Sequence, residues 1–157
     1  MNRSFLQAGF TLIELIVGIS IIAILALIIF VAIDPSRRIK AANNTTRASH
    51  VNAILNAYLN YVADNKGTHV TSTSSGVTYM IGTGGGSGTC AASTTSAKVV
   101  LTGVVDSYLT TLPYDPVSGN SEETRYYYYK SPYGRIRVGA CDPETEGTLT
   151  PSISVQR

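Results

Sequence analysis

The sequence predicts an α+β fold in which a long N-terminal helix, half apolar and half amphipathic, packs on a small C-terminal antiparallel sheet. Residues 10–33 are almost wholly apolar, and residues 51–62 carry apolar side chains at three- and four-residue spacing. Residues 126–140 contain two strand-like runs around a turn that holds Pro and Gly. The 157-residue chain leaves roughly 120 residues for one small domain with its own core.

The apolar run follows a short polar leader, MNRSFLQAG, at residues 1–9. From Leu15 to Ile33 the run has no charged residue, and about 20 such residues suffice for a helix that spans a bilayer. A secretory signal would carry its small-residue cleavage site after the apolar run, whereas here Ala8-Gly9 precede it. An uncleaved membrane anchor stays open as an alternative, and composition alone favours it.

Glu14 is the one charge in the run, and it argues against a simple anchor. A carboxylate at the centre of a membrane helix costs roughly 2.5–3.5 kcal/mol on insertion scales, and less toward the interface. No Lys or Arg lies within a helical turn or two of Glu14. Cleavage after Gly9 would create a partner, because the new α-amine of Phe10 lies four residues away on the same chain and is also available to a neighbouring chain.

The segment Gly9-Phe10-Thr11-Leu12-Ile13-Glu14 resembles the processing motif of type IV prepilins and type II secretion pseudopilins. The resemblance implies a type IV pilin-like fold. It further implies that a membrane peptidase cuts after Gly9 and methylates the amine of Phe10. Glu14 would then align subunits by pairing with a neighbour's N-terminal amine.

The same resemblance implies a location and a set of partners. The protein is expected in the inner membrane as a single-pass chain, with its N-terminus in the cytoplasm and its head outside, and then in an extracellular or periplasmic filament. Its partners would be copies of itself and related pilins, a prepilin peptidase, an inner-membrane assembly platform and, before assembly, the lipid bilayer.

Local charge favours the opposite orientation. Arg3 precedes the apolar run, whereas Arg37, Arg38 and Lys40 follow it, and positive residues usually stay in the cytoplasm. We give the motif more weight, because Asp34 offsets part of this charge and large domains translocate despite it.

The helix is expected to change environment near residue 35 and to continue as an amphipathic half over residues 34–66. Asp34-Pro35 predicts either a new helix start, with Asp as the N-cap, or a kink. Gly67 is a plausible residue for ending this half.

The remaining residues, 67–157, are predicted to form the globular head. A loop rich in Ser, Thr and Gly is expected at 67–96, with a short strand at 77–81. A second helix is expected at about 97–112, and the valines there leave a strand as the alternative. A sheet is expected at about 124–156, with strands at 126–130, 135–140 and 153–155. Within it, Tyr126 and Tyr128 should face one side, and Tyr127 and Tyr129 the other.

Cys90 and Cys141 are the two cysteines of the chain. If the head is exported, they are expected to form a disulfide that closes a loop of about 50 residues and contributes roughly 4 kcal/mol by loop entropy. Two free thiols are the alternative.

The chain is expected to bind no metal or other cofactor, with one weak exception. Residues 112–116, LPYDP, are similar to the LPxDP segment of major-pseudopilin-type subunits, some of which bind calcium in the loop that follows. Asp115 and Asp142, with Glu122 and Glu123, would supply oxygen ligands, although they match no EF-hand spacing.

The sequence contains no enzyme signature such as GxSxG or HExxH, and it is not expected to be an enzyme. A net charge of +2 gives no basis for a nucleic-acid partner. The first hypothesis is a subunit of a type IV pilus-like filament for adhesion, motility or DNA uptake, which the long Ser/Thr loop and the cysteine pair favour. The LPxDP-like segment favours a type II secretion pseudopilin. An uncleaved single-pass binding domain and a membrane-bound enzyme are the remaining alternatives.

Overall fold

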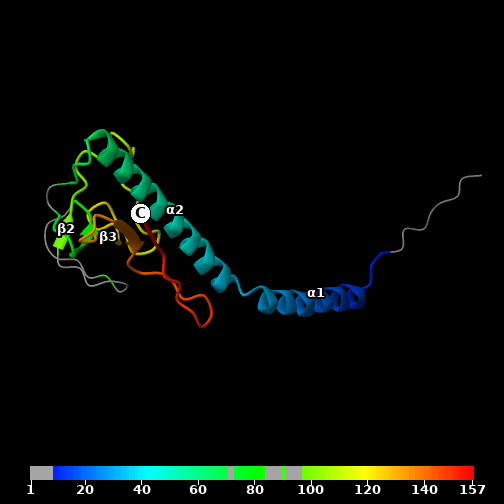
Figure 1. Cartoon of the computed structure of the whole chain (residues 1–157). Helices are drawn as coiled ribbons and strands as arrows, with labels where there is room; N and C mark the ends of the chain where they lie inside the picture. The colour runs from blue at the N-terminus through cyan, green and yellow to red at the C-terminus, as the bar shows by residue number, and fades with distance from the viewer. Residues whose placement is uncertain (1–8, 71–72, 84–89, 91–96) are drawn as a thin grey trace, which may run out of the picture. The chain divides into compact units, whose positions relative to one another are not determined.

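The structure is a computed structural model, and it describes residues 9–70, 73–83, 90 and 97–157. Most of the expected leader and much of the Ser/Thr/Gly-rich segment lie outside these residues. The chain divides into two compact units, Met1–Arg38 and Ile39–Arg157, and each is described by itself. Figure 1 shows the order of the elements along the chain.

Helix α1 spans Leu12–Ile33 and helix α2 spans Pro35–Asp64. Asp34 separates them, because its backbone adopts the left-handed conformation with φ 44°. The Asp34 carboxylate accepts the backbone N–H of Arg37 at 3.3 Å and so caps the start of α2, as Asp34-Pro35 predicted. Helix α2 ends where Gly67, with φ 82°, donates its N–H to the Val62 carbonyl at 2.8 Å.

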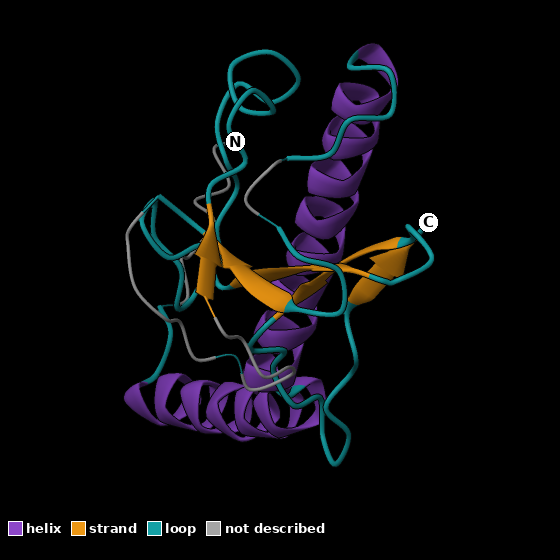
Figure 2. Cartoon of the chain, turned by 60° about the vertical axis from the view of Figure 1, so that its left-hand side comes forward, coloured by secondary structure: helices purple, strands orange, loops and turns teal. Residues whose placement is uncertain are grey.

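Five strands form one sheet in the order β2-β1-β3-β4-β5. Their bounds are β1 Thr78–Ile81, β2 Ala97–Val99, β3 Tyr126–Lys130, β4 Ile136–Ala140 and β5 Ser154–Gln156. All neighbouring pairs are antiparallel except β1 and β2, which are parallel. Figure 2 shows the strands gathered against the longer helix, α2, which confirms the predicted α+β class.

The core lies between α2 and one face of the sheet. Apolar side chains on α2 at three- and four-residue spacing meet the inward residues of β3 and β4; the fully buried members are Val51, Ile54, Leu55, Tyr58, Tyr126, Tyr128, Ile136 and Val138. The hydroxyl groups of Tyr58 and Tyr128 lie 2.8 Å apart, so these two rings satisfy each other's polar atoms inside the core. Tyr127 faces the opposite side and packs on Met80 and Cys141. The predicted alternation of the tyrosines is therefore confirmed.

The prediction of a second helix at about 97–112 is wrong. Residues 97–99 form β2, and turns follow over the rest of the segment. Gly103 and Asp106 both have positive φ, which interrupts any helix between them. A side chain at Gly103 would meet the ring of Tyr61, so the turn places its backbone against α2. The helical spacing that suggested a helix reflects the burial of Leu101 and Val104 by these turns.

Candidate processing and assembly site

The expected cleavage residues lie just before α1. Gly9 and Phe10 are exposed, Phe10 to 89%. A Cβ added at Gly9 would have no described atom within 4 Å. Nothing in the described chain therefore requires glycine at this position, and a requirement for it would have to come from a partner that closes on the backbone.

Thr11 and Glu14 form a reciprocal cap at the start of α1. The backbone N–H of Thr11 donates to Glu14 Oε2 at 2.8 Å, and the Thr11 hydroxyl donates to the same oxygen at 2.7 Å. In return the Glu14 N–H donates to Thr11 Oγ1 at 3.3 Å. This is a capping box, which satisfies backbone donors that a helix start leaves free.

The cap gives Glu14 a neutral hydrogen-bond partner in the unprocessed chain, beside the counter-ion that cleavage is expected to create. The spacing Thr-x-x-Glu is the sequence signal of this motif, so the sequence alone could have placed Thr11 beside Glu14. Both Thr11 donors use Oε2. Among the described residues nothing donates to Oε1, so this oxygen is free to accept another donor.

Helix α1 has no buried residue, and its apolar side chains are exposed on every side. Its one hydroxyl, on Ser20, donates to the Ile16 carbonyl at 2.7 Å and so needs no outside partner. The helix is long and apolar enough to cross a membrane. At about 1.5 Å per residue, its 22 residues extend roughly 33 Å, close to the thickness of a hydrocarbon core.

The disulfide expected between Cys90 and Cys141 is present. Cys141 directly follows β4 and is fully buried beside Met80 and Tyr127. The bond therefore fastens Cys90 to the outer face of the sheet.

A buried ion pair joins α2 to the LPYDP segment. Arg47 Nε and Nη2 donate to the two carboxylate oxygens of Asp115 at 2.6 and 3.0 Å, and both side chains are at most 1% exposed. Arg47 Nη1 donates to Glu144 Oε2 and to Asn44 Oδ1, each at 2.9 Å. Burial raises the pKa of Asp115, but the hydrogen bonds from Arg47 and two backbone N–H groups outweigh it and hold the pKa below its ordinary value.

These contacts also involve Asp115 and Asp142, the residues considered as calcium ligands. Asp115 is fully engaged by Arg47 and by the N–H groups of Val117 and Ser118. Asp142 is paired with Arg125 at 2.6 Å. Within the part of the chain that the structure describes, no three His, Cys, Asp or Glu side chains are grouped so as to hold a metal ion. Both aspartates therefore bind side-chain cations, Asp115 with Arg47 and Asp142 with Arg125.

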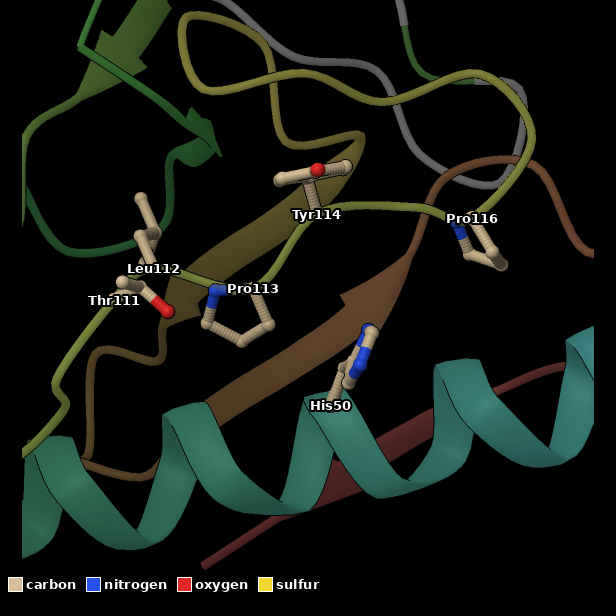
Figure 3. A pocket seen from close by; sticks show the side chains of 6 residues that line it. All are labelled: His50, Thr111, Leu112, Pro113, Tyr114 and Pro116. Carbon is tan, nitrogen blue, oxygen red and sulfur yellow. The ribbon is translucent and has the colours of Figure 1, made fainter.

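A cleft of about 540 Å³ opens beside α2. In Figure 3, His50 rises from α2 toward the loop that carries the other lining residues, Thr111, Leu112, Pro113, Tyr114 and Pro116. His50 Nδ1 lies 2.9 Å from the hydroxyl of Tyr126, so one ring nitrogen is already engaged with the core. The cleft thus offers a single imidazole on a mostly apolar wall.

An apolar N-terminal helix that follows Gly9-Phe10, together with a head in which α2 packs on a sheet, defines the pilin-like class of architectures. A family model described as the prokaryotic N-terminal methylation motif matches residues 5–30. The chain therefore carries the prepilin-type cleavage and methylation signal, which indicates a type IV pilin-like or pseudopilin-like protein. No curated protein and no solved structure matches the chain.

Proposed function

We propose that this protein is a structural subunit of a type IV pilus-like filament, cut after Gly9 by a prepilin peptidase and assembled through α1. The observation that carries the proposal is the coincidence of the methylation motif at residues 5–30 with a helix that buries none of its own residues. Such a helix needs lipid before assembly and like helices afterwards, because the apolar surface is unfavourable in water.

Glu14 supports this assembly chemistry. Cleavage after Gly9 turns the Phe10 nitrogen into a free amine, which carries positive charge. The capping box already orients the Glu14 carboxylate and leaves Oε1 open, so this oxygen can accept the amine of a neighbouring subunit. In an apolar surrounding an unpaired carboxylate is costly, so subunits that bring an amine to it are favoured over other registers.

The proposed location follows from the same chemistry. The leader would stay in the cytoplasm, and the head would be outside, where its disulfide persists. A reporter that is active only outside the cytoplasm, fused to the C-terminus, is expected to be active. An inactive reporter would contradict this orientation.

Two variants test the proposal in cells that make the filament. Gly9→Val should leave the leader attached and the protein in the membrane, because a side chain blocks the peptidase; Gly18→Ala is the matched control, since a Cβ there also meets nothing within 4 Å. Glu14→Leu should be processed normally yet assemble poorly, whereas Glu122→Leu, at an exposed position of the head, should assemble normally. Abundant normal filaments from Glu14→Leu would refute the assembly role.

A type II secretion pseudopilin is the second candidate. The LPYDP segment favours it, because this segment is similar to the LPxDP segment of major-pseudopilin-type subunits. Labelling with an antibody to the head separates the two roles. Long labelled surface filaments support the pilus, and a short periplasmic polymer supports the pseudopilus.

A further inference from the structure

The loop that joins β4 to β5 carries a leucine that is open to the surroundings. Leu149 is 75% exposed, and it ends a tight turn in which the Glu146 N–H donates to the Leu149 carbonyl at 2.8 Å. Residues 147–153 contain no charged residue. A single exposed leucine is ordinary on a protein surface, so its meaning depends on where the fold holds it.

Two asparagines fasten this loop to the first turns of α2. Asn44 donates to the Glu144 carbonyl at 2.8 Å and to Glu146 Oε1 at 2.6 Å. Asn43 donates to Glu144 Oε2 at 2.8 Å, and the Glu144 N–H donates back to Asn44 Oδ1 at 3.0 Å. Figure 1 shows the loop, in orange-red, beside this end of α2. The exposed turn is therefore held at the end of the head that α1 precedes in the chain.

Ile39 brings a second exposed apolar side chain to the same end of the head. It is 61% exposed and lies four residues before Asn43, so both are on one face of α2. Lys40 follows Ile39 and is half-buried. We call Ile39, Lys40 and Leu149 the Ile39–Leu149 face.

Chain connection alone keeps Ile39 near the end of α1, at whatever angle the two helices meet. Helix α1 ends at Ile33, two steps along the chain reach Pro35, and four helical steps lead on to Ile39. At about 3.6 Å per extended step and 1.5 Å per helical step, Ile39 is within about 13 Å of Ile33. With α1 across the hydrocarbon core, the headgroup layer beyond it is roughly 5–8 Å thick, so Ile39 lies in or just outside that layer.

Charge at this point of the chain also matches a lipid surface. Arg37 and Arg38 directly precede Ile39, and both are exposed. In the part of the chain that the structure describes, no carboxylate forms an ion pair with either arginine. Unpaired cations at this depth attract anionic lipid headgroups.

We propose that the Ile39–Leu149 face docks on the bilayer that α1 spans, with Leu149 at the boundary between headgroups and acyl chains. Exposed apolar side chains beside cations are the two features that hold a segment at a lipid interface. The proposal goes beyond the filament role, because it concerns the subunit before cleavage and requires only that α1 spans a membrane. Docking would hold the unassembled head on the membrane, and entry into a filament would require its release.

The chain contains no tryptophan, so one introduced tryptophan reports on its own surroundings. The test uses full-length Leu149→Trp in vesicles of phosphatidylethanolamine and phosphatidylglycerol, at a protein density low enough that copies do not meet. Some lipids carry a nitroxide quencher near the top of the acyl chain. We expect a blue-shifted emission maximum and loss of emission with the nitroxide lipids, because the ring would lie at the level of the quencher.

Tyr133→Trp is the matched control, since Tyr133 is 92% exposed on the turn that follows β3. The hydroxyl of Tyr126, at the start of β3, lies 2.9 Å from His50 Nδ1. The hydroxyl of Tyr128, further along β3, lies 2.8 Å from that of Tyr58. Strand β3 therefore runs along α2 away from the α1 end, and its turn lies at the far end of the head. This variant should keep its emission with nitroxide lipids, and it controls for the affinity of tryptophan itself for interfaces.

Ile39→Asn/Leu149→Trp should lose less emission than Leu149→Trp, because the face loses an apolar contact with lipid. Circular dichroism of each variant checks that the head stays folded. The proposal is overturned if Leu149→Trp is not quenched by the nitroxide lipids, if Tyr133→Trp is quenched equally, or if Ile39→Asn leaves the quenching unchanged. A blue shift without lipid quenching would assign the face to a second copy of the chain and would also overturn the proposal. Failure of processing or filament assembly does not affect these outcomes, since they are measured on uncleaved, unassembled protein.

Discussion

Glu14 and Thr11 show how a single apolar helix can carry a charge. Two hydrogen bonds from Thr11 reach one carboxylate oxygen, so the local chain meets part of the cost of placing an acid there. The remaining oxygen keeps its capacity for a partner on another subunit. The residue therefore has a local role as a cap and, in the proposed filament, an intermolecular role.

Thr11→Val should separate these roles. Valine has nearly the same shape but no hydroxyl, so the helix start loses a cap that is typically worth about 1 kcal/mol. We expect normal cleavage but fewer filaments, measured by shearing and quantifying the surface fraction. Thr11→Ser keeps the hydroxyl and should assemble like the original. Equal filament yields from the valine and serine variants would contradict the role of the cap.

Arg47 is the residue on which the head's buried polar contacts depend. Arg47→Met should lower the free energy of unfolding by about 3–5 kcal/mol, because Asp115 would stay buried without its counter-ion. Arg47→Met/Asp115→Leu should recover most of this loss. Lys98→Met breaks the pair with the half-buried Glu123, whose carboxylate stays in contact with water, and should cost less than about 1 kcal/mol.

All ten tyrosines lie in the second unit, so near-ultraviolet circular dichroism during denaturant unfolding of the full chain reports on the head. A similar small loss for Arg47→Met and Lys98→Met would show that the buried pair does not dominate.

The head should be less stable in acid. Hydrogen bonds from Asn43 and Arg47 hold the pKa of Glu144 below its ordinary value, and that of Asp115 is lowered as well. Carboxylates with lowered pKa stabilise the folded state above about pH 4, and this contribution is lost as the pH falls through their folded pKa. Burial also lowers the pKa of His69, which adds an earlier loss as the pH falls below about 6.5.

Unfolding free energies measured from pH 7 to pH 2 should therefore fall in two stages. In Arg47→Met the stage below about pH 4 should flatten, because Asp115 loses the interaction that lowered its pKa, while the stage from His69 remains. An unchanged acid stage in this variant would contradict the assignment.

At the scale of elements, a periodic pattern in the sequence predicts the structure correctly where that pattern has one physical explanation. The stripe from Val51 to Tyr58 and the alternating tyrosines of β3 each have a buried and an exposed side, and the structure places them as expected. The helix predicted over residues 97–112 is wrong, because the apolar spacing in this segment arises from turns that pack against Tyr61. No local pattern could reveal that contact, since it depends on where Gly103 meets α2.

The functional residues likewise fall into those that the sequence alone could place and those that only the fold brings together. Gly9, Phe10 and Glu14 form a contiguous motif, so the sequence alone could place them. The pairing of Arg47 with Asp115 joins residues 68 positions apart, and only the packing of the loop on α2 brings them together. Nothing in the local sequence distinguishes the buried Arg47 from an exposed arginine.

The disulfide joins Cys90 to Cys141 at the end of β4. It closes a separation of 51 residues, so its removal in Cys90→Ser/Cys141→Ser should lower the free energy of unfolding by roughly 4 kcal/mol. A reductant should lower the stability of the original protein to that of the variant and leave the variant unchanged. Insensitivity of the original protein to reductant would contradict a stabilising bond.

At the scale of the whole molecule, the head and helix α1 differ in how much they bury. Residues Ile39–Arg157 contain the core, the disulfide and the buried ion pair, whereas α1 has no buried residue. A head that packs by itself and a helix that needs outside partners form a chain suited to polymerisation through one end. In this account, removal of the leader converts a membrane-anchored monomer into a subunit competent to assemble.

The most direct test of this claim is the intact mass of the protein isolated from the cells that make it, with fragmentation at its N-terminus. We predict a chain that begins at Phe10 and carries one added methyl group on its α-amine. A native chain that still begins at Met1, or that is cut at another position, would contradict the account, because the amine proposed to pair with Glu14 would not exist.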